Sequence, residues 1–253
     1  MRTARYPLRK PAPTPRLQPL WRQYAQESRR PLYCLIFLFP LVATYEFGAM
    51  LLRPVVWPER QLVAHSLILK LLAWFGAHGI WLPAVALLLT LLAWHVLEGY
   101  SWRIRGWVLP LMVLESAVLT LPLFVLGNVM TQAATAVAVP QLRHQIVLAL
   151  GAGVYEELVF RLYLVTGLSL VLETGLRVPA RFARPATVAL SAATFAVCHF
   201  TPLGSEPFRA AHFLLLLLAG TYLAIVFVER GLGIAAGCHA AFNLIPLIVR
   251  TAL

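Results

Sequence analysis

Glu156-Glu157-Leu158-Val159-Phe160-Arg161 lies inside an apolar run from about His144 to Leu172, and the architecture of the chain follows from it. A helix over such a run is long enough to cross a bilayer, because ~20 residues at ~1.5 Å each cover the ~30 Å hydrocarbon core. Charged groups at that depth are costly, so they are rare and usually serve a transport pathway or a reaction. Three charges within this stretch therefore indicate a functional centre inside the membrane.

On a helix, the two carboxylates of this stretch point in different directions. Glu157 and Arg161 lie one turn apart on the same face, so they can form an ion pair. Glu156 projects about 100° away from Glu157. We therefore expect Arg161 to hold Glu157 in a largely structural pair and Glu156 to be left for chemistry.

The composition is that of a membrane protein. Of the 253 residues, 60% are hydrophobic and 12% are charged, and the mean hydropathy is +0.77. Soluble domains carry ~25% charged residues, and several uncharged runs here approach or exceed the ~18 residues of a membrane-spanning helix. The sequence predicts an all-α, polytopic transmembrane helical bundle with about seven to eight spans, because helices satisfy their own backbone hydrogen bonds in lipid.

The net charge of +11 indicates a membrane surface rather than nucleic acid as the partner. Eight of the 21 Lys and Arg lie in residues 1–31, and most others fall between apolar runs. Cytoplasmic loops beside anionic lipid have this pattern. Nucleic-acid binding would need the basic residues on one exposed face.

Seven runs are predicted to cross the membrane. A shorter run, 62–76, carries Lys70 and is predicted to lie in the interface or to re-enter the membrane, because ~15 residues are short for a span. Counting it as an eighth span would place the arginine-rich loops 103–105 and 177–184 outside, against the positive-inside rule, so we favour seven. The predicted spans are 31–53, 78–98, 107–130, 144–172, 185–200, 209–228 and 231–248.

Two parts are distinguished along the chain. Residues 1–31 hold six prolines and eight basic residues but a single acid, Glu27. They bury too little apolar surface to fold alone, so we predict a disordered cytoplasmic tail. Residues 32–253 form one transmembrane domain, whose motif-bearing core covers 144–250.

Two later helices add polar groups at helical spacing. The first carries Phe195 and, one turn on, His199, and the last carries His239 and, one turn on, Asn243. Together with Glu156 these side chains suit attack of water on a carbonyl group. A carboxylate in an apolar pocket can act as general base, and a histidine can hold the water or pass on its proton. A second histidine and an amide can stabilise the oxyanion.

The same side chains permit a zinc site as the alternative. Glu156, His199 and His239 match the His₂Glu set of known zinc hydrolases. The sequence lacks an HExxH motif, so a cofactor-free, water-activating glutamate is our first hypothesis and zinc the second.

Other polar groups in apolar runs have simpler explanations. The cysteines form no CxxC pair, and those preceding the two histidines point about 100° away from them, so we expect small packing residues rather than nucleophiles. Two further histidines are expected to be helix-packing or interfacial residues. Two glutamates have no basic or imidazole residue one turn away in the sequence and are expected to be packing or secondary pocket groups. These residues are Cys34, Cys198, Cys238, His95, His212, Glu46 and Glu115.

The order Glu156-Glu157-x-x-x-Arg161, Phe195-x-x-x-His199, His239-x-x-x-Asn243 resembles the CPBP family of intramembrane proteases (CAAX proteases and bacteriocin-processing enzymes, also called ABI). The resemblance covers about residues 144–250. It implies a helical-bundle protease domain with a site in the membrane interior.

Through this resemblance the motif residues take on roles. Glu156 would activate water, His199 and His239 match the family's histidines, and Asn243 matches the oxyanion-stabilising position, with Glu157, Arg161 and Phe195 in support. The substrate would be a membrane-embedded or lipid-modified protein or peptide. A bacterial inner membrane with the N-terminus in the cytoplasm is the expected location. A transporter and a non-catalytic membrane scaffold are the rival hypotheses.

Overall fold

A computed structural model describes residues 19–56, 62–131, 142–200 and 206–252. These residues form helices, and the described part contains no strand beyond one isolated parallel bridge between Phe200 and Glu206. The predicted all-α class is confirmed. The elements are α1 (Leu20–Glu27), α2 (Pro31–Val56), α3 (Val63–Trp74), α4 (Leu82–Leu97), α5 (Val108–Leu119), α6 (Leu121–Thr131), α7 (Leu142–Glu157), η1 (Leu158–Tyr163), α8 (Leu164–Ser169), η2 (Leu170–Gly175), α9 (Ala180–Cys198), α10 (Ala210–Arg230) and α11 (Leu232–Ala252).

Among the residues that the structure describes, five stretches are long and apolar enough to cross a membrane, which confirms the predicted polytopic bundle. The other elements are shorter or more polar. With 12 residues, α3 covers only about 18 Å, as expected for the predicted interfacial segment. Helix α4 has only 16 residues, and α9 begins with a polar turn that carries Arg181 and Arg184, so neither is counted among the five stretches. The five stretches are Pro31–Leu52, Val108–Gly127, Leu142–Gly175, Ala210–Arg230 and Leu232–Val249.

Within the tail, residues 20–27 are helical, so the prediction of disorder over 1–31 is wrong for them; residues 1–18 lie outside the described residues. Helix α1 is held by contacts distant in sequence. The Tyr24 hydroxyl donates to Glu115 Oε2 at 2.5 Å, and Glu115 also pairs with Arg230. Burial and the neighbouring Glu115 carboxylate raise the pKa of Tyr24 well above its usual range, so its hydroxyl stays a donor. Glu115 therefore has the basic partner that its own helix lacks.

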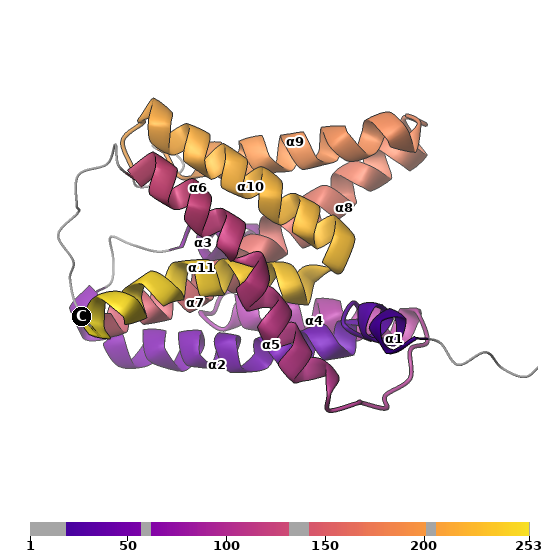
Figure 1. Cartoon of the computed structure of the whole chain (residues 1–253), viewed down its shortest axis with the longest axis horizontal. Coiled ribbons are helices and arrows are strands. Elements are labelled where there is room, and N and C mark those ends of the chain that lie inside the picture. The colour runs from indigo at the N-terminus through magenta and orange to yellow at the C-terminus, as the bar shows by residue number, and fades with distance from the viewer. Residues whose placement is uncertain (1–18, 57–61, 132–141, 201–205, 253) are drawn as a thin grey trace, which may run out of the picture.

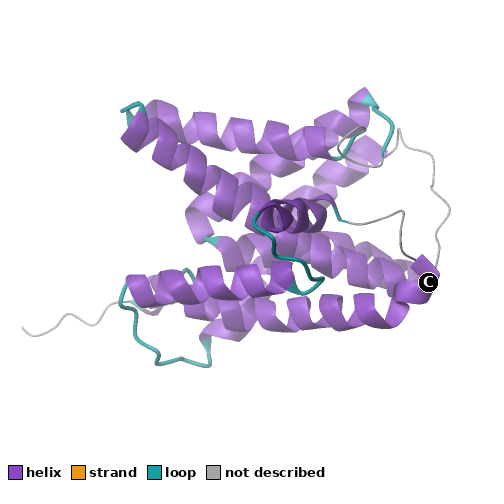
Figure 2. Ribbon diagram, turned by 180° about the vertical axis from the view of Figure 1, so that it is seen from behind, coloured by secondary structure: helices purple, strands orange, loops and turns teal. Residues whose placement is uncertain are grey.

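Helix α7 lies in the interior of the bundle, between α2 and α11 (Figure 1). Helix α9 lies at the edge of the bundle opposite α2, and α10 packs against it; Figure 2 shows the bundle from behind. The approach of α7 to α11 depends on Gly153, because a Cβ there would lie 2.6 Å from the Ala240 backbone nitrogen. Ten of the residues of α7 are buried, including both glutamates. The apolar run 144–172 is thus a central helix.

The central helix changes its winding directly after the two glutamates. Leu158–Tyr163 and Leu170–Gly175 are π-helical, and α8 lies between them. The Ser191 hydroxyl of α9 donates to the Phe160 carbonyl at 2.6 Å. π-helical turns are rare and often occur at functional sites.

Substituting Gly153 tests this packing. Gly153→Ala forces α7 away from α11 and is expected to lower the free energy of unfolding by about 1–3 kcal/mol, the usual effect of overpacking. The matched control is Gly167→Ala in α8, where a Cβ meets nothing within 4 Å and the change is expected to be neutral or stabilising. Thermal unfolding in detergent compares the two, and equal midpoints would contradict the close packing.

Candidate active site

Glu156 faces two histidines contributed by two other helices. Its Oε1 lies 3.9 Å from His199 Nε2, and its Oε2 lies 3.7 Å from His239 Nε2. Glu156 is the penultimate residue of α7, His199 follows the last residue of α9, and His239 lies in α11. Glu156 and His239 are buried, and His199 is half-buried. Three elements far apart in sequence therefore converge on one carboxylate.

Glu157 makes a second set of contacts on the opposite side of His239. Its Oε2 pairs with Arg161 Nε at 3.2 Å, as the spacing predicts, and its Oε1 lies 2.9 Å from His239 Nδ1. Glu157 and Arg161 are completely buried. Because a carboxylate paired with arginine is an acceptor, His239 donates through Nδ1–H, and its Nε2 is turned toward Glu156.

Arg161 is neutralised and enclosed from several directions. Its Nη2 donates to the Gly220 carbonyl at 3.2 Å, and its guanidinium lies 4.4 Å from the centre of the Phe195 ring. The approach of α10 at this point is close, since a Cβ on Gly220 would lie 3.0 Å from Phe195. The predicted supporting residues thus share one buried cluster with His239.

Phe195 also positions His199. The two rings lie 4.6 Å apart, and the Phe195 carbonyl accepts a hydrogen bond from His199 Nδ1 at 2.8 Å. Since a carbonyl only accepts, Nδ1 carries the proton, and in the neutral ring Nε2 is an acceptor. Glu156 and His199 therefore present two acceptors to each other.

Asn243 lies one turn beyond His239 on α11 and is half-buried. Within the described part of the chain, its amide makes no hydrogen bond to the other predicted site residues. The structure thus gathers Glu156, Glu157, Arg161, Phe195, His199 and His239 by direct contact and places Asn243 on the same helix as His239. All three cysteines are free and buried, in agreement with a packing role.

Sequence reasoning missed Glu206. Its backbone N–H donates to the His199 carbonyl at 3.3 Å, and its carboxylate pairs with His212 Nδ1 at 2.9 Å. The hydrogen bond with His212 holds the pKa of Glu206 below its ordinary value, with a smaller contribution from His199. No local signal identifies this residue, because Glu206 lies in a polar connection. Its partner is His212, which is expected from the sequence to be a packing or interfacial residue. Glu46, likewise expected to be a packing or pocket group, accepts a hydrogen bond from the Tyr155 hydroxyl.

The donor types for zinc are present, since Glu156, His199 and His239 form a His₂Glu set. Among the residues that the structure describes, no three His, Cys, Asp or Glu side chains are placed to hold a metal ion. If an ion were bound, these three side chains would be its ligands and it would polarise a carbonyl or activate water. The zinc alternative stays an untested hypothesis.

The region that carries these residues matches a known protein family. Residues 138–245 match the family described as type II CAAX prenyl endopeptidase Rce1-like. The Rce1-like family is part of the CPBP family, so this region matches the family that the motifs resemble. The matched CPBP segment contains every motif residue from Glu156 to Asn243, and the resemblance seen in the sequence is confirmed. No match is found among curated proteins or among solved structures.

The buried ion pair can be tested by a double-mutant cycle. Arg161→Met leaves the buried Glu157 carboxylate without its cationic partner, with only the His239 hydrogen bond remaining of the contacts described above, and is expected to cost about 3–5 kcal/mol of stability. Replacing both residues, Glu157→Leu with Arg161→Met, is expected to recover most of that loss, because no unpaired charge remains. Denaturant unfolding in detergent measures all variants. Additive losses, with the double variant the least stable, would contradict the pairing.

Proposed function

We propose that this CPBP protein is an intramembrane endopeptidase that hydrolyses a peptide bond of a membrane-embedded or lipid-modified protein or peptide with water activated by Glu156. Membership in a CAAX endopeptidase family supports peptide-bond hydrolysis at a membrane. The identity of the nucleophile and the roles of the individual residues are our inference from the geometry.

One observation carries the proposal: each oxygen of the buried Glu156 carboxylate faces Nε2 of a different histidine, at 3.9 and 3.7 Å. These separations exceed a hydrogen bond and suit groups that share a water molecule. Between Glu156 and His199, both of which accept, a water molecule can donate one hydrogen to each. Such a water directs its lone pair away from both groups, toward a substrate carbonyl.

In the proposed reaction, the water oxygen bonds to the carbonyl carbon while Glu156 takes its proton. The tetrahedral intermediate then collapses, the C–N bond breaks, and the leaving nitrogen receives the proton from Glu156. His239 is within reach of the same carboxylate and can pass this proton on. Glu157 acts as a positioning residue, because it fixes which ring nitrogen of His239 faces Glu156.

The developing oxyanion requires hydrogen-bond donors. Asn243 carries an amide on the helix of His239, and the described residues leave that amide unengaged. A preorganised donor of this kind stabilises the transition state more than the substrate, since the negative charge develops only during attack. We therefore assign Asn243 to the oxyanion.

Two other functions make different demands on the same residues. A zinc-dependent protease would use Glu156, His199 and His239 as ligands rather than as base and proton carriers. A transporter or scaffold would need no peptide hydrolysis. The family match favours the protease over both non-catalytic functions.

Replacing Glu156 is the decisive test of the mechanism. Glu156→Gln is expected to lower kcat by at least about 10²–10⁴, the usual contribution of a general base. The assay compares cleavage of a library of membrane peptides in liposomes, with and without a strong zinc chelator. The matched control is Glu98→Gln, an exposed carboxylate at the end of α4, which should retain wild-type cleavage.

Three results of this assay are distinguishable. Cleavage that survives chelation and disappears in Glu156→Gln supports the glutamate mechanism. Loss on chelation with recovery on added zinc would replace it with the metalloprotease. Equal cleavage by the Glu156→Gln variant and the wild type would reject the assignment of Glu156.

The role of Asn243 predicts a specific kinetic signature. Asn243→Ala is expected to lower kcat by about 10²–10³ while KM changes little, because the lost hydrogen bond forms only with the oxyanion. Steady-state kinetics on one cleaved peptide measures this. Thr221→Ala is the control, since the Thr221 hydroxyl donates to the Leu217 carbonyl of its own helix. A change in KM alone would assign Asn243 to substrate binding instead.

A further inference from the structure

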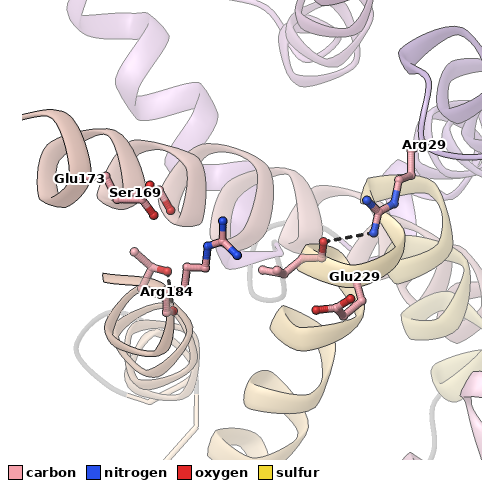
Figure 3. Close-up of a pocket in the computed structure, with 7 residues that line it drawn as sticks. Arg29, Ser169, Glu173, Arg184 and Glu229 are labelled. Atoms are coloured by element: carbon pink, nitrogen blue, oxygen red, sulfur yellow. Dashed lines mark hydrogen bonds between the residues drawn. The ribbon is translucent and has the colours of Figure 1, made fainter. Parts of the chain in front are cut away.

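A polar cavity of about 420 Å³ lies at the opposite end of the bundle from His199. Its polar lining consists of Arg29, Ser169, Glu173, Arg184, Thr187 and Glu229 (Figure 3). The volume falls within the range of small-molecule sites, ~300–1,000 Å³. None of these residues belongs to the proposed active site.

This cavity is far from the catalytic cluster. Arg184 and His199 lie at opposite ends of α9, and the helix rise places them about 22 Å apart. Three candidate spans place the cavity at the membrane surface. Arg29 lies two residues before Pro31–Leu52, Glu173 lies near the end of Leu142–Gly175, and Glu229 lies near the end of Ala210–Arg230. The cavity is therefore at the depth of lipid headgroups.

The charges of the cavity are mixed and unpaired. Figure 3 shows Arg184 between Glu173 and Glu229, with Arg29 beyond Glu229, so opposite charges alternate along the site. Within the described residues, no carboxylate lies within 4.0 Å of the guanidinium of Arg29 or Arg184. Arg29 Nη2 donates only weakly, to the Val228 carbonyl at 3.4 Å. Two cations and two anions thus remain available to a ligand.

We propose that this cavity binds the headgroup of a phospholipid that carries both a phosphate and a primary amine, a phosphoethanolamine headgroup. Arginine forms strong, often bidentate hydrogen bonds with phosphate, and carboxylates accept hydrogen bonds from an ammonium group. A pocket selective for anionic lipid would be basic, whereas this one balances two arginines with two glutamates.

The lining distinguishes an ethanolamine from a choline headgroup. Quaternary ammonium groups are recognised by aromatic cages, and the described lining contains no aromatic ring. Carboxylates instead suit a primary ammonium, which donates hydrogen bonds. Glu173 is held by the π-helical segment η2, a type of turn found often at functional sites.

The surroundings favour a lipid over a soluble phosphate compound. Large apolar side chains are exposed on three of the helical segments that line the cavity: Leu170 of η2 is 63% exposed, Phe182 of α9 is 58% exposed, and Ile225 of α10 is 49% exposed. Acyl chains attached to the headgroup would cover such side chains in the membrane. A soluble phosphoethanolamine would leave them uncovered.

The test measures lipid binding to the purified full-length protein by native mass spectrometry. Short-chain phosphatidylethanolamine, phosphatidylcholine and phosphatidylglycerol are compared as probes. We expect phosphatidylethanolamine to bind at least about tenfold more tightly than the other two, the effect of one charge-assisted hydrogen bond. Arg184→Gln and Glu229→Gln should each abolish this preference, and Arg184→Lys should retain part of it.

The matched control is Arg181→Gln, which removes an arginine from the same helix outside the cavity and should leave the preference intact. Size-exclusion chromatography checks that each variant is folded. Tighter binding of phosphatidylglycerol, or equal binding of all three lipids, would overturn the proposal. Equal thermal stabilisation by soluble phosphoethanolamine at matched concentration would overturn the lipid as the occupant.

Discussion

The structure depends on the neutralisation of Arg161 in the middle of the bundle. A guanidinium group with no exposed surface needs a carboxylate, further acceptors and close packing, because an unpaired charge at this depth would be very costly. Glu157 supplies the charge, the Gly220 carbonyl supplies an acceptor, and the Phe195 ring covers the guanidinium face. Each of these partners comes from a different helical element, so this one charge fixes how the central helix, α9 and α10 approach one another.

The same network orders the site. Glu157 uses its second oxygen to hold His239, and Phe195 uses its carbonyl to hold His199. The two groups that neutralise and cover Arg161 thus also orient the two imidazoles. Both rings are left with Nε2 directed at Glu156. A buried structural pair and the carboxylate that we propose activates water can therefore be adjacent in sequence, because the 100° step of a helix separates their surroundings.

The opposite end of the bundle is organised by polar contacts of a different kind. Tyr24, Glu115 and Arg230 join α1, α5 and α10 where the basic loops are predicted to face the cytoplasm. The charges of the nearby cavity, in contrast, have no such partners among the described residues. A membrane protein can leave charges unpaired at this depth because lipid headgroups and water are there to solvate them. The contrast between an ion-paired arginine in the interior and arginines without an ion pair at the surface follows from the dielectric of each region.

The helical membrane class, the central helix and the candidate site residues all follow from the amino-acid sequence alone. Composition, helical period and the cost of intramembrane charge are local properties, so they single out Glu156, Glu157, Arg161, His199 and His239 without knowledge of the packing. Tertiary contacts were needed to establish which ring nitrogens face Glu156, that Glu115 has a partner in Arg230, and that residues 20–27 form a helix. These features depend on groups that are close in space but many residues apart in the chain, and no periodicity along the chain records such contacts.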